Sequence, residues 1–539
     1  MRKLMTAFVA LVMAATACPC QAGGLLTNTN QNVAFLRNPA RDGVIAIDGV
    51  YSNPAGVAFL PNGLHISLNN QSAFQTRIIN SGMSVPGLEG TPYYHPLSMN
   101  GGDENGVKQY KGEASAPIVP SFQVAWNHDK WGFQMGFALV GGGGKCTFNE
   151  GLGSFERQIA LLPAVMQQTN QLYQQQYGID LGLGTDTPGY SVESYMHGQQ
   201  YIFGLQLGAT YKLNEHLAVY GGFRFNYILN KYKGSIQNIS VNVGGAMENL
   251  HQFLGNKAAG LTEQAAQYQT QATTYAAMAE EAMAQGNTQL AQQLGEAAQQ
   301  LTQAAQLAQG GAQAMESTQG QVADKRLECT QRGWAIAPII GIDWKWEKLN
   351  IGARYEFPSQ CNIQNDTKVD DTGLFADGVN TPGDIPALFT IGAQYELLSN
   401  LRLMAGYHLF FDKDADMADE KQKKLGGNTW EVNAGAEYDI TDAITVSAGM
   451  QRTKYDLADG GYLTDMSFVT SSYSIGLGAC VKVAKNIKVN VAYFWTNYET
   501  FDKAYEQEYS MGGQTITAHN TDSFTRTNKV FGVGVDFTL

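Results

Sequence analysis

The sequence is short of charge, of basic residues and of long apolar runs. Only 15% of its 539 residues are Asp, Glu, Lys or Arg, and the formal net charge is −13. This acidity argues against nucleic acid as a partner. No stretch of about 18 apolar residues follows the N-terminal segment, which excludes a transmembrane helix in the mature chain.

The first 22 residues have the pattern of a secretory signal peptide. Arg2 and Lys3 precede an apolar run, and small residues lead to Ala22, so we expect cleavage before Gly23. A lipoprotein signal ending at Cys18 is disfavoured, because Ala15 stands where such signals prefer Leu.

From residue 63 onward, short segments alternate apolar with polar residues. In the last segment Phe531, Val533 and Val535 fall on one face, and Gly532 and Gly534 on the other. A strand that spans lipid must pair its backbone with neighbours and present apolar side chains on one face. Tight turns alternate with long loops, and the even count suits a single-chain barrel. We therefore predict an all-β fold, a 14-stranded antiparallel transmembrane barrel in the bacterial outer membrane. The predicted strands are 63–75, 117–126, 131–140, 200–211, 217–230, 333–344, 348–357, 386–396, 401–410, 428–438, 443–453, 473–483, 487–497 and 524–539.

The seven tryptophans support this orientation. Trp126, Trp131, Trp344 and Trp346 flank predicted short periplasmic turns, and the other three lie near outer strand ends. Because amphipathic rings favour the headgroup level, they predict two interfacial belts.

Two cysteines suggest a cross-link. Cys329 precedes one strand of a predicted hairpin and Cys361 follows the other, which brings both to the outer end. An exported compartment permits a disulfide there, although coincidence explains the spacing nearly as well.

Residues 23–62 do not alternate and are free to enter the barrel. They contain Asn38-Pro39-Ala40 and a second copy, Asn53-Pro54-Ala55, just before the first strand. In this position the segment resembles the N-terminal hatch of FadL-type outer-membrane transporters, which carry long-chain fatty acids and other hydrophobic molecules. The resemblance covers the hatch, the strand count and the final strand. Leu539 departs from it, because an aromatic is usual at the C-terminus for recognition by the barrel-assembly machinery.

The resemblance implies a mechanism. Hydrophobic ligand is captured in an outer groove, passes to a lumenal pocket, and leaves sideways into the bilayer beside a kinked third strand after the hatch rearranges. Gly132, Gly136 and the run 141–144 would ease such a kink. Glycines there could equally make room for the hatch.

Three cations stand out on the predicted lumenal face at a similar height. Arg224, Arg354 and His408 could bind a fatty-acid headgroup, since a guanidinium fork matches a carboxylate. The alternative is internal pairing with lumenal carboxylates. The candidates for that role are Glu356, Glu437, Asp42 and Asp48.

Two outer loops carry helical patterns. Phe155, Ile159, Leu162 and Met166 form an apolar stripe, interrupted by Pro163, that lines a groove or packs against other loops. The Ala- and Gln-rich stretch 246–323 predicts a helical hairpin between strands five and six, broken at Gly286-Asn287. Its predicted seam combines Leu254, Ala258, Leu261, Ala265, Tyr268, Ala272, Tyr275, Ala279 and Ala282 with Leu290, Leu294, Ala297, Leu301, Ala304 and Ala308.

The predicted organisation is a signal peptide at 1–22, a hatch at 23–62 and a barrel at 63–539. Passive uptake of hydrophobic molecules is the favoured function; a non-specific porin, or an adhesion or assembly protein acting through 246–323, is the alternative. No nucleophile, metal or nucleotide motif accompanies the eight scattered histidines, so we expect no enzyme, cofactor or metal site. The expected partners are hydrophobic small molecules, outer-membrane lipid and lipopolysaccharide, and the barrel-assembly machinery during biogenesis, and we expect a monomer.

Overall fold

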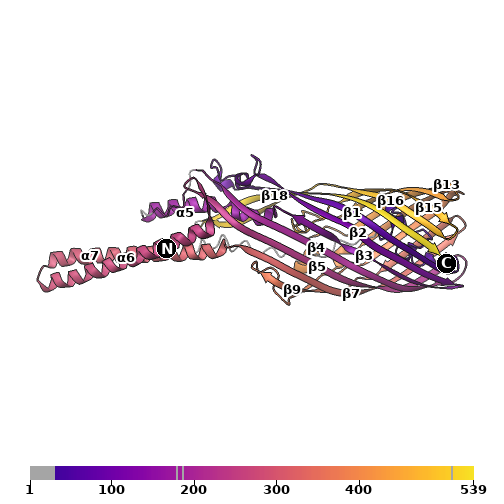
Figure 1. Cartoon of the computed structure of the whole chain (residues 1–539), viewed down its shortest axis with the longest axis horizontal. Helices are drawn as coiled ribbons and strands as arrows, with labels where there is room; N and C mark the ends of the chain where they lie inside the picture. Colours follow the sequence, from indigo (N-terminus) through magenta and orange to yellow (C-terminus); the bar gives the residue numbers. More distant parts are fainter. Residues whose placement is uncertain (1–30, 178–179, 185–186, 512–513) are drawn as a thin grey trace.

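The computed structural model describes residues 31–177, 180–184, 187–511 and 514–539. The predicted signal peptide and residues 23–30 of the predicted hatch lie outside these ranges. The fold is a closed antiparallel barrel of fourteen strands, in which each wall strand pairs with the next and the last pairs with the first (Figure 1). The predicted strand count and order are therefore confirmed. The wall strands are β1 (Gly63–Ser84), β2 (Val107–His128), β3 (Trp131–Phe148), β4 (Tyr190–Lys212), β5 (Leu217–Val243), β7 (Lys325–Trp346), β8 (Leu349–Glu356), β11 (Leu388–Leu398), β12 (Leu401–Phe410), β13 (Thr429–Thr441), β14 (Ile444–Lys454), β15 (Ser472–Ala484), β16 (Ile487–Tyr498) and β18 (Gln514–Thr538).

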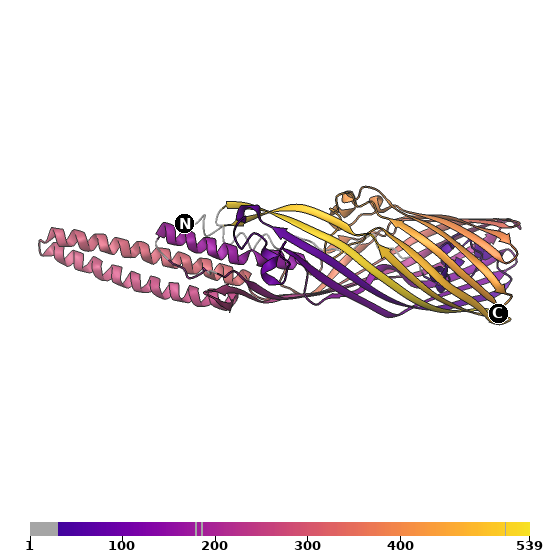
Figure 2. The ribbon, with the colours of Figure 1, turned by 90° about the horizontal axis from the view of Figure 1, so that it is seen from above.

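The barrel wall is much taller on one side. Strands β18, β1, β2, β4, β5 and β7 have 22 to 27 residues, whereas β8 and β11 to β16 have 8 to 13. A bilayer requires only about 9–11 residues of a tilted strand. The long strands therefore continue well beyond the lipid, toward the helical hairpin (Figures 1 and 2). Four shorter strands of the described chain extend this outer sheet. They are β6 (Ala246–Asn249), β9 (Asn362–Asp370), β10 (Asn380–Pro382) and β17 (Phe501–Met511).

Alternation on the strands separates a lipid-facing surface from a filled lumen. On β18, Phe531 and Val533 are about half exposed, while Val530 is buried inside. Trp126, Trp131, Trp334, Trp344 and Trp346 are likewise exposed, as expected of interfacial belts. Across the described ranges, no helix combines the length and apolar character needed to cross a membrane.

The outer loops carry the helices. Short 3₁₀ turns η3 (Pro86–Leu88), η4 (Pro96–Asn100), η5 (Asp412–Asp414) and η6 (Ala418–Lys424) accompany two α-helices, α4 (Gly153–Ala160) and α5 (Leu162–Tyr177). The break between α4 and α5 confirms the interruption predicted at Pro163, which now occupies the first turn of α5, where its missing N–H costs nothing.

The predicted helical insertion is present as α6 (Leu250–Ala284) and α7 (Thr288–Gln321), two long helices that pack side by side (Figure 2). In α6 the seam follows the prediction at Leu254, Ala258 and Ala272, which are buried, although Tyr275 is 38% exposed. In α7 one predicted row is displaced by one position. The buried row is Ala291, Ala298, Ala305 and Ala312, not Leu290, Ala297 and Ala304. Every member of the buried row is alanine, including Ala291 in place of the predicted Leu290, and this small side chain allows close approach of the two backbones.

The predicted disulfide is absent, because Cys329 and Cys361 are both free thiols. The chain does not stop pairing after the hairpin, but continues into β9 alongside β7. Cys329 consequently lies opposite Thr367, and its sulfur accepts a hydrogen bond from the Thr367 hydroxyl at 3.2 Å. Cys361 lies beside Gly333, several residues nearer the periplasmic turn. The prediction paired Cys329 with Cys361 because both are a similar number of residues from the turn of the hairpin. It did not include β9, which supplies the actual neighbour of Cys329.

Candidate functional site

The described part of the hatch, residues 31–62, fills the barrel interior with short helices. These are α2 (Val33–Arg37), α3 (Gly49–Ser52) and η2 (Gly56–Phe59). Asn32 caps α2 by accepting a hydrogen bond from the Ala34 N–H, and its amide donates to Gln123 on β2 at 2.8 Å. Every residue of α2 is buried. The lumen therefore holds a folded plug rather than an aqueous channel.

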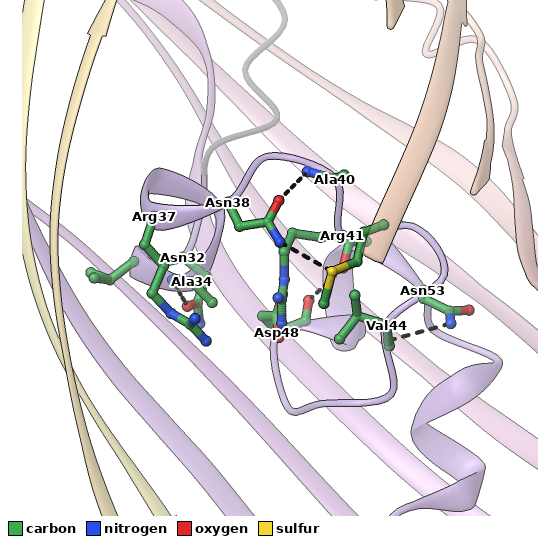
Figure 3. Close-up of polar contacts among 12 residues, drawn as sticks. Asn32, Ala34, Arg37, Asn38, Ala40, Arg41, Val44, Asp48 and Asn53 are labelled. Carbon is green, nitrogen blue, oxygen red and sulfur yellow. Dashed lines mark hydrogen bonds and ion pairs between the residues drawn. The ribbon is translucent and has the colours of Figure 1, made fainter. Parts of the chain in front are cut away.

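The two Asn-Pro-Ala motifs both make tight turns. Asn38 Oδ1 accepts a hydrogen bond from the Ala40 N–H at 3.1 Å, which makes an Asx turn (Figure 3). Asn53 Oδ1 accepts one from the Gly56 N–H, three residues on, at 3.2 Å. Both bonds satisfy backbone groups at a point where proline disfavours helix.

The second motif also joins the hatch to the wall. The Asn53 amide donates to Asp343 on β7 at 2.6 Å, and the Pro54 carbonyl accepts from Gln134 on β3 at 2.6 Å. Ala55 is fully buried against Tyr220 and Ile339. Each residue of Asn53-Pro54-Ala55 thus contacts a wall strand.

An ion-pair cluster fixes the first motif. Glu437 on β13 accepts from Arg37 at 2.8 Å and from Arg41 at 2.9 Å, and Arg41 also pairs with Asp48 at 2.7 Å. All four side chains are at least nine-tenths buried. Buried charges of this kind are tolerated only when paired, so removing one partner is costly.

The three predicted cations lie in the lumen but are occupied by protein groups. Arg224 pairs with Glu356 at 2.5 Å and Arg354 donates to the Tyr51 carbonyl. Both guanidinium groups stack on the Tyr51 ring, at 4.8 and 4.4 Å from its centroid. They therefore hold the hatch helix α3 from β5 and β8, the strands on either side of β7.

His408 lies between two carboxylates. Its Nε2 is 2.9 Å from Asp42 of the hatch, and its Nδ1 is 2.8 Å from Glu431 on β13. Because carboxylates accept hydrogen bonds, this geometry fits a ring that is protonated on both nitrogens. The contacts of Arg224 and His408 match the internal-pairing alternative, whereas Arg354 binds the Tyr51 carbonyl and ring instead of a carboxylate.

Some hatch contacts were not predicted. Arg37 and Arg41 flank the first Asn-Pro-Ala, and Asp343 is a lone acid on the lumenal face beside Trp344. Charged residues are rare in membrane-embedded segments, so the presence of Arg37, Arg41 and Asp343 was the sequence signal that could have identified these contacts. Glu437 was predicted as a partner, but it binds hatch arginines instead of the three wall cations.

The glycines of β3 divide between two roles. Gly132 and Gly136 lie in regularly paired strand, opposite Asn127 and Gln123 of β2. A Cβ on Gly136 would lie 3.1 Å from a methyl of Val50, so this glycine makes room for the hatch. The predicted kink is therefore absent at Gly132 and Gly136, and the irregularity falls in the run 141–144 that the prediction also named.

The irregularity lies higher on the same strand. Leu139 faces Phe203 of β4 and Gly144 faces Gln200, so five steps along β3 match three along β4. Gly142 and Gly144 have φ of +100° and +70°, values that disfavour other residues.

On the other edge of β3 the pairing with β2 is lost. It stops at Phe122–Phe137 and resumes only at Glu113–Thr147. Pro117 and Pro120 of β2 lie in this interval and lack the N–H that a ladder requires. The wall is thus interrupted between β2 and β3, above the hatch.

An apolar pocket of about 130 Å³ lies among the outer loops. Phe155, Ile159 and Leu162 of the predicted stripe line it, together with Ile236 of β5 and Leu374 of the 357–387 loop. Met166 instead packs into the neighbouring buried cluster. The stripe therefore both lines a pocket and packs against neighbouring loops, the two alternatives that the sequence left open.

Comparison with known proteins gives a fold relationship. No family model and no curated protein matches the sequence. A FadL homologue of Pseudomonas aeruginosa matches in structure with a TM-score of 0.55 and 12% identity, covering 96% of this chain and 100% of its own. The TodX deltaS2S3 mutant monoaromatic hydrocarbon channel (TM-score 0.49, 11% identity, 96% and 100%) and the P. putida toluene transporter TodX (0.45, 12%, 92% and 94%) are less similar. The first match spans nearly all of both chains, so this chain has the fold of a FadL-type outer-membrane transporter.

Proposed function

We propose that the protein allows hydrophobic small molecules to enter passively through the outer membrane and to leave the barrel sideways between β2 and β3. The interrupted β2–β3 ladder above a plugged lumen carries this proposal. A solute moving down a plugged barrel needs an exit, and a gap in the wall leads to lipid, where an apolar solute is stable.

The outer pocket is suited to the first step of uptake, the capture of a hydrophobic molecule from outside. Its lining is mainly apolar, and it lies on the tall side of the wall, beyond the bilayer. A molecule captured there is partly desolvated before it reaches the lumen. The hatch would then rearrange enough to admit it, with Asn53, Pro54 and Ala55 as attachment points to the wall.

Long-chain fatty acids are the favoured cargo, and monoaromatic hydrocarbons are the main competitor, because proteins named for such hydrocarbons share the fold. Arg224, Arg354 and His408 are proposed to hold the hatch in its resting position. A headgroup could reach them only after the hatch moves, since each is at most 3% exposed.

A second candidate function is adhesion through the α6–α7 hairpin. The observation that favours it is a group of exposed apolar side chains near the hairpin tip, at Tyr275, Met278, Met283 and Leu290. Contiguous exposed apolar residues often mark interaction sites. This function is compatible with uptake by the barrel.

Straightening β3 tests the proposed exit. Deletion of Gly142 and Gly143 removes the two residues by which β3 exceeds β4. We expect assembled barrels with strongly reduced uptake of radiolabelled oleate and toluene by cells that lack other routes. Gly144→Asn is the matched control, since it keeps the strand length at a position with open space around a Cβ and asparagine tolerates positive φ. Unchanged uptake after the deletion would contradict exit through this gap.

A further inference from the structure

In the described part of the chain, two lumenal arginines without an acidic partner lie side by side, whereas Arg354, which also lacks one, is held by the carbonyl and the ring of Tyr51. Arg77 of β1 and Arg526 of β18 are directly opposite each other where the first and last strands pair. Arg77 donates to the Gly143 carbonyl at 3.1 Å, and Arg526 donates to the Phe468 carbonyl at 3.4 Å and to Gln75 at 3.3 Å. Within the described ranges, neither forms an ion pair with a carboxylate.

This pairing is unfavourable as it stands. Like charges on directly opposed residues of an antiparallel pair repel each other. Arg526 is only 8% exposed, and the Nε atoms of both arginines are buried without a hydrogen-bond partner. By contrast, Arg37, Arg41 and Arg224 each contact a carboxylate within 2.9 Å. A buried cation pair of this kind is stabilised if an anion binds between its members.

We propose that Arg77 and Arg526 bind the anionic headgroup of an amphipathic molecule at the interrupted wall. Two guanidinium forks suit a carboxylate or a phosphate ester. The Gly143 carbonyl places the site at the irregular part of β3, next to the gap.

The surroundings suit an apolar tail. Phe468, whose carbonyl accepts from Arg526, and Phe524, two residues before Arg526 on β18, belong to one buried apolar cluster with Cys146 and Phe148. This inference rests on the proposed uptake function and narrows its cargo to anionic amphipaths in preference to neutral hydrocarbons.

Paired ligands with the same tail test the site. Purified protein in a neutral detergent is titrated with oleate, oleyl phosphate and oleyl alcohol. We expect the unmodified protein to bind at least one anion about tenfold or more tightly than the alcohol, as charge-assisted hydrogen bonds imply. The preferred anion identifies a carboxylate cargo or a phosphate-bearing lipid.

The Arg77→Gln/Arg526→Gln double variant should lose this preference while binding the alcohol as before. Arg332→Gln, which removes an exposed cation of β7, is the control. This variant should still bind the anion more tightly than the alcohol. Without ligand, the double variant should unfold at the same temperature as the unmodified protein or at a higher one, because the repulsion between the two arginines is gone. If the arginines only stabilised the fold, the double variant would unfold at a lower temperature.

Two failures remain distinguishable. Equal binding of anions and alcohol by the unmodified protein, or an unchanged preference in the double variant, would overturn the anion site and leave hydrophobic uptake standing. Failure to bind any of the three ligands would contradict the proposed function itself.

Discussion

At the residue scale, Glu437 holds the hatch more directly than any other acid of the wall. It accepts hydrogen bonds from two buried hatch arginines at 2.8 and 2.9 Å. Glu437→Gln leaves Arg37 without a charge partner, and such losses cost about 3–5 kcal/mol. We expect the hatch to loosen, so that the variant admits small antibiotics to which the parent is resistant.

The measurement is antibiotic sensitivity at matched levels of barrel in the membrane. Glu499→Gln is the control, because it removes an acid from an ion pair with Arg452 that is largely exposed, and exposed pairs contribute little. Equal sensitivity of the Glu437 variant and the parent would show that the cluster does not secure the hatch.

Asp412, in the outer loop 411–428, predicts a pH dependence. Burial raises the pKa of its carboxyl from 3.8 to about 7, although hydrogen bonds from Thr429 oppose the shift. The folded protein thus binds more protons than the unfolded chain between these values, and stability falls as pH rises through them. Asp412→Asn should raise the unfolding temperature at pH 8 relative to the parent.

The same comparison at low pH provides the check. Near pH 4 the parent carboxyl is already neutral when folded, so the advantage of Asp412→Asn should disappear. Thermal unfolding followed by tryptophan fluorescence in detergent gives both values. An advantage that is independent of pH would contradict the assigned cause.

Individual residues also mark the limit of sequence reasoning. Alternation placed Arg224, Arg354 and His408 on the lumenal face correctly, because a strand sends alternate side chains to opposite sides. Glu356 and Asp42 were among the candidate partners, but alternation could not assign each to its cation, and Tyr51 was not predicted because the hatch has no regular periodicity. The position of the irregularity was left open for a related reason: Gly132, Gly136 and the run 141–144 look alike in sequence, and only the register with β4 separates them.

At the element scale, the α6–α7 hairpin should be dispensable for the barrel beyond its base. Leu250, Leu254 and Met315 pack into the outer apolar cluster, whereas the distal part contacts only itself. Deletion of 264–284 together with 289–309 removes three heptads from each helix and keeps the native turn. We expect normal assembly and normal oleate uptake.

Binding to surfaces is the second readout for this deletion. If the exposed tip acts in adhesion, the shortened protein should lose attachment of cells to hydrophobic surfaces while uptake persists. A control with Met278 and Met283 replaced by Gln keeps the length and removes the apolar tip. Loss of uptake in the shortened protein would instead give the hairpin a part in capture.

Elements were predictable where lipid constrains them. The predicted strands coincide with the lipid-spanning part of each wall strand, because only there must one face be apolar. Outside the bilayer that constraint ends, so β1 was predicted to stop at 75 but continues to Ser84, and β5 continues from 230 to Val243. The helices were predictable because Ala- and Gln-rich heptads suit few other structures.

At the scale of the whole molecule, the plug predicts electrical behaviour. The hatch fills the lumen, so the intact protein should give no steady porin-like conductance in planar bilayers. Deletion of residues 31–60 should produce large, lasting conductance steps, since the lumenal face lined by small and polar residues would then hold water. A porin-like signal from the intact protein would contradict a closed resting state.

The seam between the first and last strands sets an order on assembly. Leu64 and Leu539 exchange backbone hydrogen bonds at 2.9 and 2.8 Å, and the hatch that precedes β1 packs against Gly532 of β18. The earliest part of the chain must therefore be inside before the latest part closes the ring, or be threaded in afterwards through a finished wall. In the first case, the hatch must fold before β1 and β18 pair. A hatch that folds slowly would then delay closure of the barrel and leave two unpaired strand edges in the membrane.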